Sequence, residues 1–204
     1  MNSESNQKSG SYLDVYQKIY NTLGYGSPYI SRGVYQAKYM MSELKEGDKV
    51  LCVGCGNGYE VIQYLLAGMD AYGTETHPIK GVPILEGRII NAVAPGMPFK
   101  NKEFRLVQCC EVLEHIPEEI TLPFMADLMM IGEKVLFTTS TRDDPPFCTH
   151  INYHGPEWWL KRLEELRAII HNFQFNPQMD LLYENALISR RVDKDRVLMH
   201  VSEA

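Results

Sequence analysis

Short apolar runs alternate with segments of helical periodicity along the chain from residue 47 onward. The apolar runs are typical of buried parallel strands, which are covered on both faces and therefore apolar throughout. They predict strands at residues 49–53, 69–74, 88–94, 104–109 and 134–139. The segments between them predict helices at residues 59–67, 121–131 and 156–170. A charged turn at residues 193–195, flanked by runs at 186–191 and 196–202, predicts a closing β-hairpin.

This order of elements predicts an α/β fold whose consecutive strands are joined by right-handed helical crossovers. We expect a doubly wound three-layer sandwich, with a mostly parallel seven-stranded sheet and a C-terminal antiparallel hairpin. The helix at residues 59–67 is expected to end at Gly68 and to turn four residues inward: Val61, Ile62, Leu65 and Leu66. Ligands of such sheets bind beyond the carboxyl ends of the strands, so the residues directly after each strand are the candidates for a site.

The N-terminal part of the chain has a different composition. Residues 1–10 are small and polar and predict a flexible tail. Residues 11–45 predict two helical segments around a Gly-Ser-Pro break, and seven of the twelve tyrosines fall within the first forty residues. Tyrosine buries a large ring while its hydroxyl stays in water. The segment is therefore interpreted as either a docking face or a lid over a ligand. The length of the chain predicts a single domain of residues 1–204.

Charge and cysteine content narrow the class of protein. Twenty Lys and Arg against twenty-six Asp and Glu give a net charge of −6, which argues against a broad nucleic-acid-binding face. No apolar run approaches the about 20 residues of a membrane-spanning helix, and the polar start lacks the apolar stretch of a secretory signal. The five cysteines are irregularly spaced, so we expect free thiols and a cytoplasmic location. Cys52 and Cys55 form a C-x-x-C without the second pair of a zinc site.

A glycine-rich loop follows the first predicted strand. It leads directly into a helix and consists of Gly54, Cys55, Gly56, Asn57 and Gly58. Glycines let the backbone approach a ligand closely, and the first N–H groups of a helix have no partner within it. Glu75 ends the second strand, 21 residues after Gly54 (75 − 54), the interval expected for an acid that binds ribose hydroxyls. The G-x-G-x-G spacing differs from the G-x-G-x-x-G of dinucleotide-binding loops.

Three segments together carry a family resemblance. They are residues 50–58, which hold the loop, residues 97–99 with 104–116, which contain Glu-Val-Leu-Glu-His-Ile, and residues 150–157. In this order they resemble class I, Rossmann-like S-adenosylmethionine-dependent methyltransferases, and among these the small-molecule, ubiquinone-type enzymes. The matches run in order over residues 50–160, which is most of the chain.

The resemblance implies S-adenosylmethionine as the cofactor and places residues around it. The loop of residues 54–58 would line its methionine part, Glu75 would hold the ribose hydroxyls, and Thr76 would lie beside it. Asn91 and Ala92 would lie at the adenine ring. After the fourth strand, Cys109 and Glu111 would lie near the methionine and adenine ends.

Three positions depart from the pattern of the family. Cys52 and Asn91 stand where Asp is usual, and Arg105 replaces the Asp of a Phe-Asp-Leu-Val sequence. Asn91 still offers a side-chain oxygen to the adenine amine, whereas Cys52 removes an acid that would lie near the cofactor's ammonium group. Residues 11–45 are expected to cap the cofactor, with Arg32 as a bidentate partner for its carboxylate.

Two histidines follow the fifth predicted strand, on the side where the cofactor's methyl group would project. A sulfonium methyl is reactive, so an enzyme aligns the acceptor and needs at most one base. His150 and His154 are the candidate catalytic bases, whereas His115 is expected to pack against a helix start. Cys148 with the two candidate bases lacks a fourth zinc ligand, so we expect no metal site.

Three hypotheses of different classes follow. The leading one is a methyltransferase that transfers a methyl group to an O or N atom of a small-molecule acceptor. A non-catalytic module that binds S-adenosylmethionine or S-adenosylhomocysteine is the second, and the three departures above support it. A nicotinamide-dependent oxidoreductase is the third, and the glycine spacing argues against it. The acidic surface and the absence of a spare domain favour a small acceptor over a protein or tRNA.

Overall fold

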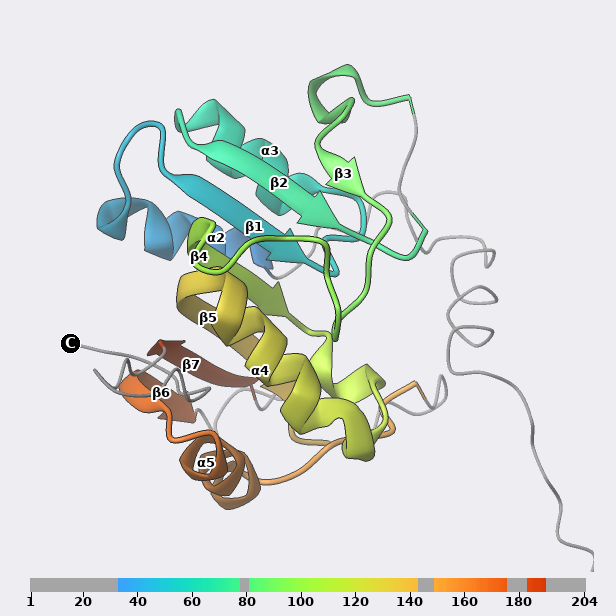
Figure 1. Cartoon of the computed structure of the whole chain (residues 1–204), viewed down its shortest axis with the longest axis vertical. Coiled ribbons are helices and arrows are strands. Elements are labelled where there is room, and N and C mark those ends of the chain that lie inside the picture. Colours follow the sequence, from blue (N-terminus) through green and yellow to red (C-terminus); the bar gives the residue numbers. More distant parts are fainter. Residues whose placement is uncertain (1–32, 78–80, 143–148, 176–182, 190–204) are drawn as a thin grey trace, which may run out of the picture.

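The structure is a computed structural model, and it describes residues 33–77, 81–142, 149–175 and 183–189 (Figure 1). Its helices are α2 (Gly33–Met40), α3 (Tyr59–Leu66), α4 (Thr121–Ile131) and α5 (Pro156–Glu165). Its strands are β1 (Lys49–Val53), β2 (Asp70–Thr74), β3 (Ile89–Ile90), β4 (Phe104–Cys110), β5 (Gly132–Ser140), β6 (Ile169–Phe175) and β7 (Tyr183–Ser189). Short 3-10 helices lie at η1 (Met41–Glu43), η2 (Pro83–Leu85), η3 (Leu113–His115) and η4 (Glu118–Ile120).

The described strands form one sheet in the order β3-β2-β1-β4-β5-β7-β6. The first five in this order pair in parallel, whereas β7 is antiparallel to both β5 and β6. From β1 the chain proceeds outward to β3, and then returns to β4 on the other side of β1 (Figure 1). The direction of winding therefore reverses between β1 and β4, and the crevice beyond their carboxyl ends is the expected ligand position.

Alternate residues of the strands face two separate cores. On β1, Leu51 and Val53 pack with apolar residues of α4 and α5. Val50 and Cys52 pack on the other face with residues of α2 and α3. The period of two along a strand thus produces a three-layer sandwich, with α2 and α3 on one side of the sheet and α4 and α5 on the other.

A buried polar chain fixes α2 to the sheet. Tyr64 of α3 donates its hydroxyl to Gln108 Oε1 of β4 at 2.7 Å. The Gln108 Nε2 group donates in turn to the carbonyl of Gly33 at the start of α2, at 2.9 Å. A side chain at Gly33 would place its Cβ 2.2 Å from Glu60 Oε1. A side chain at this position would therefore fit only if the side chains of Glu60 and Gln108 moved.

Helix α3 ends as the sequence predicts, but its inner face differs from the prediction. Gly68 has φ 88°, and the N–H of Met69 donates to the carbonyl of Tyr64 at 3.0 Å, which is the pattern of a Schellman cap. Leu66 is 75% exposed, so its predicted inward position is wrong. Tyr64 takes the buried position instead, because its hydroxyl has a partner on β4.

Helix α5 ends five residues earlier than predicted. Arg167 takes the left-handed conformation, with φ 52°. Its N–H donates to the carbonyl of Glu164, and that of Ala168 donates to Leu163, both at 2.7 Å. This is again a Schellman cap, formed without glycine. The prediction of a helix through Ile170 is therefore wrong, since β6 begins at Ile169.

The remaining predictions differ in detail. Strand β3 has two residues, fewer than the predicted 88–94. Residues 186–189 lie in β7, whose two edges pair with β5 and β6, whereas their predicted partner, 196–202, lies outside the described residues. The tail of residues 1–10 and the predicted cap as far as residue 32, Arg32 included, also lie outside them. Within the described part, no helix combines the length and apolar character needed to cross a membrane.

Candidate functional site

The glycine-rich loop after β1 adopts a conformation that only glycine takes readily. Gly54, Gly56 and Gly58 have φ values of 66°, 52° and 73°. A Cβ on Gly54 would lie 2.5 Å from Cγ2 of Val112, and one on Gly58 would lie 2.6 Å from Cδ1 of Leu85. The loop is therefore packed closely against the segments that follow β4 and precede β3, and it leads its backbone to the carboxyl edge of the sheet.

Cys55 takes part in this loop through its backbone. Its N–H donates to the carbonyl of Thr74 at 3.0 Å, and its carbonyl accepts from Gly58 at 2.8 Å. Its side chain is buried beside Gly73, where a Cβ would lie 2.5 Å from the sulfur. Burial, and secondarily the charge of Glu75, raises the pKa of the Cys55 thiol well above its ordinary value. The thiol is thus a neutral part of the core. Asn57, next to Gly58, is the polar side chain of the loop, and it is half-buried.

Glu75 connects the end of β2 to the loop. Its Oε2 accepts from the N–H of Gly56 at 2.8 Å. Its Oε1 accepts from the N–H of Thr76 at 2.7 Å, from the Thr76 hydroxyl at 3.0 Å and from the N–H of His77 at 3.3 Å. These contacts hold a carboxylate that is 6% exposed at the edge of the sheet. The structure thus brings together the loop, Glu75 and Thr76.

Asn91 and Ala92 follow β3 at the same edge. The Asn91 Nδ2 group donates to the carbonyl of Thr76 at 3.3 Å, so the segment after β3 lies beside that after β2. Asn91 is exposed and Ala92 is half-buried.

The end of β4 combines a buried thiol with a strained carboxylate residue. Cys109 is fully buried, and burial raises the pKa of its thiol. Glu111 has φ 57°, which is uncommon for a residue with a side chain. Its N–H donates to the carbonyl of Thr138 at 3.1 Å, and its Oε1 accepts from the Thr138 hydroxyl at 2.7 Å. Backbone strain of this kind costs about 1–3 kcal/mol and is concentrated at functional sites.

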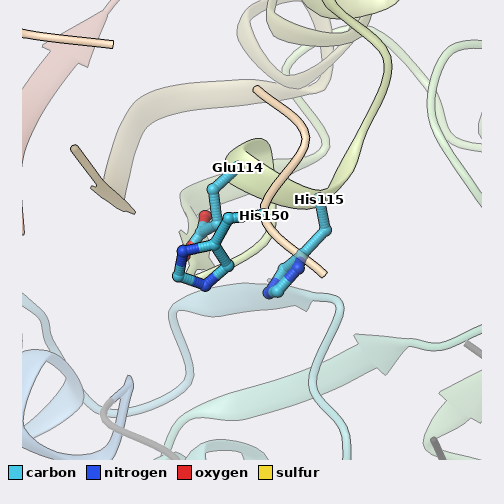
Figure 2. A group of neighbouring side chains, drawn as sticks. All are labelled: Glu114, His115 and His150. Atoms are coloured by element: carbon cyan, nitrogen blue, oxygen red, sulfur yellow. The ribbon is translucent and has the colours of Figure 1, made fainter. Parts of the chain in front are cut away.

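Glu114, His115 and His150 form a compact group next to this edge (Figure 2). One ligand atom of each residue lies within 4.8 Å of those of the other two. The two imidazole rings meet edge to face, with centroids 4.9 Å apart. Glu114 is fully buried, and its Oε2 accepts from the hydroxyl of Thr139 at 3.2 Å. The group joins the segment after β4 to the segment after β5.

Hydrogen bonds set the position of His150 relative to Glu114. The carbonyl of Glu114 accepts from the N–H of Ile151 at 2.8 Å and from that of Asn152 at 3.0 Å. The buried Asn152 Nδ2 group also donates to the carbonyl of Leu113 at 3.0 Å and to Thr121 Oγ1 at 2.9 Å. The segment that carries His150 is thereby held against η3.

The structure separates the two predicted catalytic histidines. The ring of His154 stacks on that of Trp158, with centroids 4.0 Å apart and planes inclined by 10°. Its Nε2 lies 3.2 Å from Oε2 of Glu118 on η4. Within the described residues, His150 therefore belongs to the group around Glu114, whereas His154 lies with Trp158 of α5 and Glu118 of η4.

Two members of this group lie beside His150 although the sequence did not place them there. His115 was expected only to pack against a helix start, and Glu114 was assigned no role. Their adjacency after β4 was the available signal. Their proximity to His150 depends on the contacts of Ile151 and Asn152, which no spacing rule predicts.

Solved structures share this architecture. No protein-family model and no curated protein matches the chain. The 1,6-didemethyltoxoflavin-N1-methyltransferase of Burkholderia thailandensis, crystallised with 1,6-didemethyltoxoflavin and S-adenosylhomocysteine, is 13% identical, with a TM-score of 0.67 over 89% of this chain and 87% of that one. The magnesium protoporphyrin IX methyltransferase of Synechocystis PCC 6803, with bound S-adenosylmethionine, is 15% identical, with a TM-score of 0.67 over 90% and 99%.

A third similar structure contains a different small molecule. The geranyl diphosphate C-methyltransferase of Streptomyces coelicolor A3(2), in complex with Mg²⁺, geranyl diphosphate and S-adenosylhomocysteine, is 12% identical, with a TM-score of 0.62 over 90% of this chain and 100% of that one. The chain thus has the α/β, Rossmann-like fold of class I S-adenosylmethionine-dependent methyltransferases. At these identities the likeness is one of fold, and the residues of the site carry the argument about activity.

Proposed function

We propose that the chain is a methyltransferase that binds S-adenosylmethionine and transfers its methyl group to an O or N atom of a small-molecule acceptor. The observation that carries the proposal is the junction of the glycine-rich loop with Glu75, through the 2.8 Å contact of the Gly56 N–H with Glu75 Oε2. It lies at the carboxyl edge of the sheet, where the winding reverses. The cofactors of the similar structures support the choice of ligand.

The lone pairs of Glu75 support its assignment to the ribose. A carboxylate offers about four acceptor sites. Among the described residues, three donors lie at Oε1, with the His77 N–H the most distant at 3.3 Å, whereas the Gly56 N–H donates to Oε2. In our proposal, Oε2 takes a second hydrogen bond from a ribose hydroxyl. Glu75 then orients both the loop and the ligand.

The other parts of the cofactor are assigned by position. The loop residues Gly54, Cys55, Gly56, Asn57 and Gly58 line its methionine part, with Cys55 acting through its backbone. Thr76 lies beside the ribose, and Asn91 with Ala92 lies at the adenine ring. At the end of β4, Cys109 contributes its backbone, and Glu111, whose φ is positive, follows the strand with its carboxylate.

The chemistry requires alignment and the removal of one proton. The acceptor's lone pair attacks the methyl carbon, the C–S bond breaks, and its electron pair stays on sulfur to give the thioether S-adenosylhomocysteine. A hydroxyl acceptor also loses a proton. His150 is the preferred base, because its Nδ1 lies 2.7 Å from the carbonyl of Arg142. A carbonyl only accepts, so in the neutral ring Nδ1 carries the proton and Nε2 carries the lone pair. His154 is the second candidate.

Parallel calorimetric titrations of the full chain with S-adenosylhomocysteine and NADH test the cofactor. We expect S-adenosylhomocysteine to bind and NADH not to bind. The variant Glu75→Ala should weaken binding by about 1–3 kcal/mol, because a charged hydrogen-bonding partner is lost. Glu86→Ala, an exposed glutamate on the segment before β3, is the control and should leave the affinity unchanged. Unchanged affinity in Glu75→Ala would refute the ribose assignment.

Transfer of a labelled methyl group tests activity and acceptor class together. We expect label in a small-molecule pool rather than in protein or RNA pools, consistent with the small acceptors of the similar structures. Binding of S-adenosylhomocysteine without transfer to any pool would instead support the non-catalytic module. Selective binding of NADH would support the oxidoreductase.

A further inference from the structure

The group of Glu114, His115 and His150 has the composition of a metal site (Figure 2). Ligands at about 2.1 Å from a tetrahedral ion lie about 3.4 Å from one another. The ligand atoms of these three residues lie within 4.8 Å of one another, so small rotations of the side chains bring them to that spacing. We propose that these residues bind a divalent transition-metal ion.

The hydrogen bonds of both rings prepare their other nitrogens for an ion. His115 Nδ1 lies 3.1 Å from the carbonyl of Thr149, and His150 Nδ1 lies 2.7 Å from that of Arg142. Since a carbonyl only accepts, in the neutral rings both Nδ1 atoms carry the proton and both Nε2 atoms carry a lone pair. A metal-binding histidine donates its other N–H to a carbonyl or carboxylate in this way, which fixes its tautomer and its orientation.

The carboxylate supplies the negative charge. Glu114 is fully buried beside the two rings, and its Oε2 is oriented by the hydroxyl of Thr139 at 3.2 Å. Burial of a carboxylate is costly unless it is paired or coordinates a metal. A divalent cation between Glu114 and the imidazoles would stabilise it. Two imidazole nitrogens and one carboxylate oxygen favour Zn²⁺, Co²⁺, Fe²⁺ or Ni²⁺ over Mg²⁺ or Ca²⁺.

Three protein ligands leave at least one coordination position for another molecule. This step rests on the proposed function: the ion would bind the hydroxyl oxygen of the acceptor and lower the pKa of that hydroxyl, so that it releases its proton to water near neutral pH and the oxyanion attacks the methyl carbon. His150 would then hold the ion rather than take the proton. The expectation of no metal site considered Cys148, His150 and His154, which share only His150 with this group.

Titration of the full chain with Co²⁺, after removal of metals by a chelator, tests the site through the visible absorption of coordinated cobalt. We expect one ion per chain. His115→Ala and His150→Ala should each weaken cobalt binding by at least about 10–100-fold, the loss that even an outer-shell partner causes. Glu114→Gln, which keeps the shape but removes the charge, should weaken it similarly. His154→Ala is the matched control for cobalt binding, because that ring stacks on Trp158 outside the group.

Each variant is also titrated with S-adenosylhomocysteine, which reports folding and the cofactor site. If a variant loses cobalt binding but still binds S-adenosylhomocysteine, the result supports the replaced residue as a metal ligand. If cobalt binds the intact chain no better than it binds His115→Ala and His150→Ala, the metal proposal is overturned and the cofactor proposal stands. Tight cobalt binding without any S-adenosylhomocysteine binding would overturn the proposed function and leave the metal site intact.

Discussion

Replacing Asn152 by alanine should destabilise the fold where the segment that carries His150 is held against η3. The Asn152 Nδ2 group donates to the carbonyl of Leu113 at 3.0 Å and to Thr121 Oγ1 at 2.9 Å. The residue is 1% exposed, so both contacts lie away from bulk water. Both lost contacts lie on elements that follow β4, and Asn152 itself follows His150.

The expected size of the effect follows from these contacts. Leaving a buried acceptor without its donor costs about 1–3 kcal/mol, so two of them cost about 2–6 kcal/mol. The Asn152 Oδ1 atom is itself buried and accepts no hydrogen bond within the described residues. Its removal recovers about 1–2 kcal/mol of desolvation. With central values of about 4 kcal/mol for the cost and about 1.5 kcal/mol for the recovery, the free energy of unfolding should fall by about 2.5 kcal/mol.

Urea unfolding of the full chain measures this change. With a slope of about 2 kcal/mol per molar urea, the midpoint should fall by about 1–2 M. Ile151→Ala is the adjacent control: its side chain is 52% exposed, and its midpoint should change much less. Asn152→Asp should be at least as harmful as the alanine variant, since it replaces the donor by a buried acceptor. A midpoint for Asn152→Ala equal to that of the unmodified chain would refute the reasoning.

Three further changes test other parts of the structure. Tyr64→Phe should lower the free energy of unfolding by about 1–3 kcal/mol, because Gln108 Oε1 loses the 2.7 Å contact in a buried position; urea midpoints measure it, and an unchanged midpoint contradicts it. Gly54→Ala should weaken S-adenosylhomocysteine binding in calorimetry, since φ 66° and a 2.5 Å approach to Val112 force the loop to move; normal affinity would show that the loop tolerates a side chain. The free energy of unfolding should fall as the pH rises above about 8.5, by up to about 1.4 kcal/mol per pH unit for each buried thiol. Burial raises the pKa of these thiols and keeps them protonated in the folded state, whereas they ionise in the unfolded chain. The thiols are those of Cys52, Cys55, Cys109 and Cys110. Equal urea midpoints at pH 7 and pH 10 would contradict this.

The ends of α3 and α5 show how far local sequence predicts the fold. Both helices end in the same left-handed cap. Gly68 predicts the cap of α3, whereas the cap of α5 is formed by Arg167, a residue type that seldom takes this conformation. The apolar residues after Arg167 fit a helix or a strand equally well by periodicity. Pairing with β7 decides in favour of a strand, and that contact is remote in sequence.

The candidate site likewise has a part that the sequence could predict and a part that it could not. The loop after β1 and Glu75 could be predicted, because glycine conformation and strand ends are local properties, and the structure brings them within 2.8 Å of each other. The neighbours of His150 could not. They depend on two backbone hydrogen bonds to the carbonyl of Glu114, which lies 36 residues earlier (150 − 114). Residue type alone therefore grouped His150 with His154, which lies elsewhere.

The position of β1 between β2 and β4 has a consequence for biosynthesis. Val50 pairs with Ala71 on one side and with Leu106 on the other. The second partner is made 56 residues after Val50 (106 − 50), which takes a ribosome about 3–11 s at about 5–20 residues per second. During that interval the edge of β1 that β4 will cover is open in the nascent chain. An unpaired strand edge can pair with a second chain, so β1 is exposed to self-association until β4 has been made.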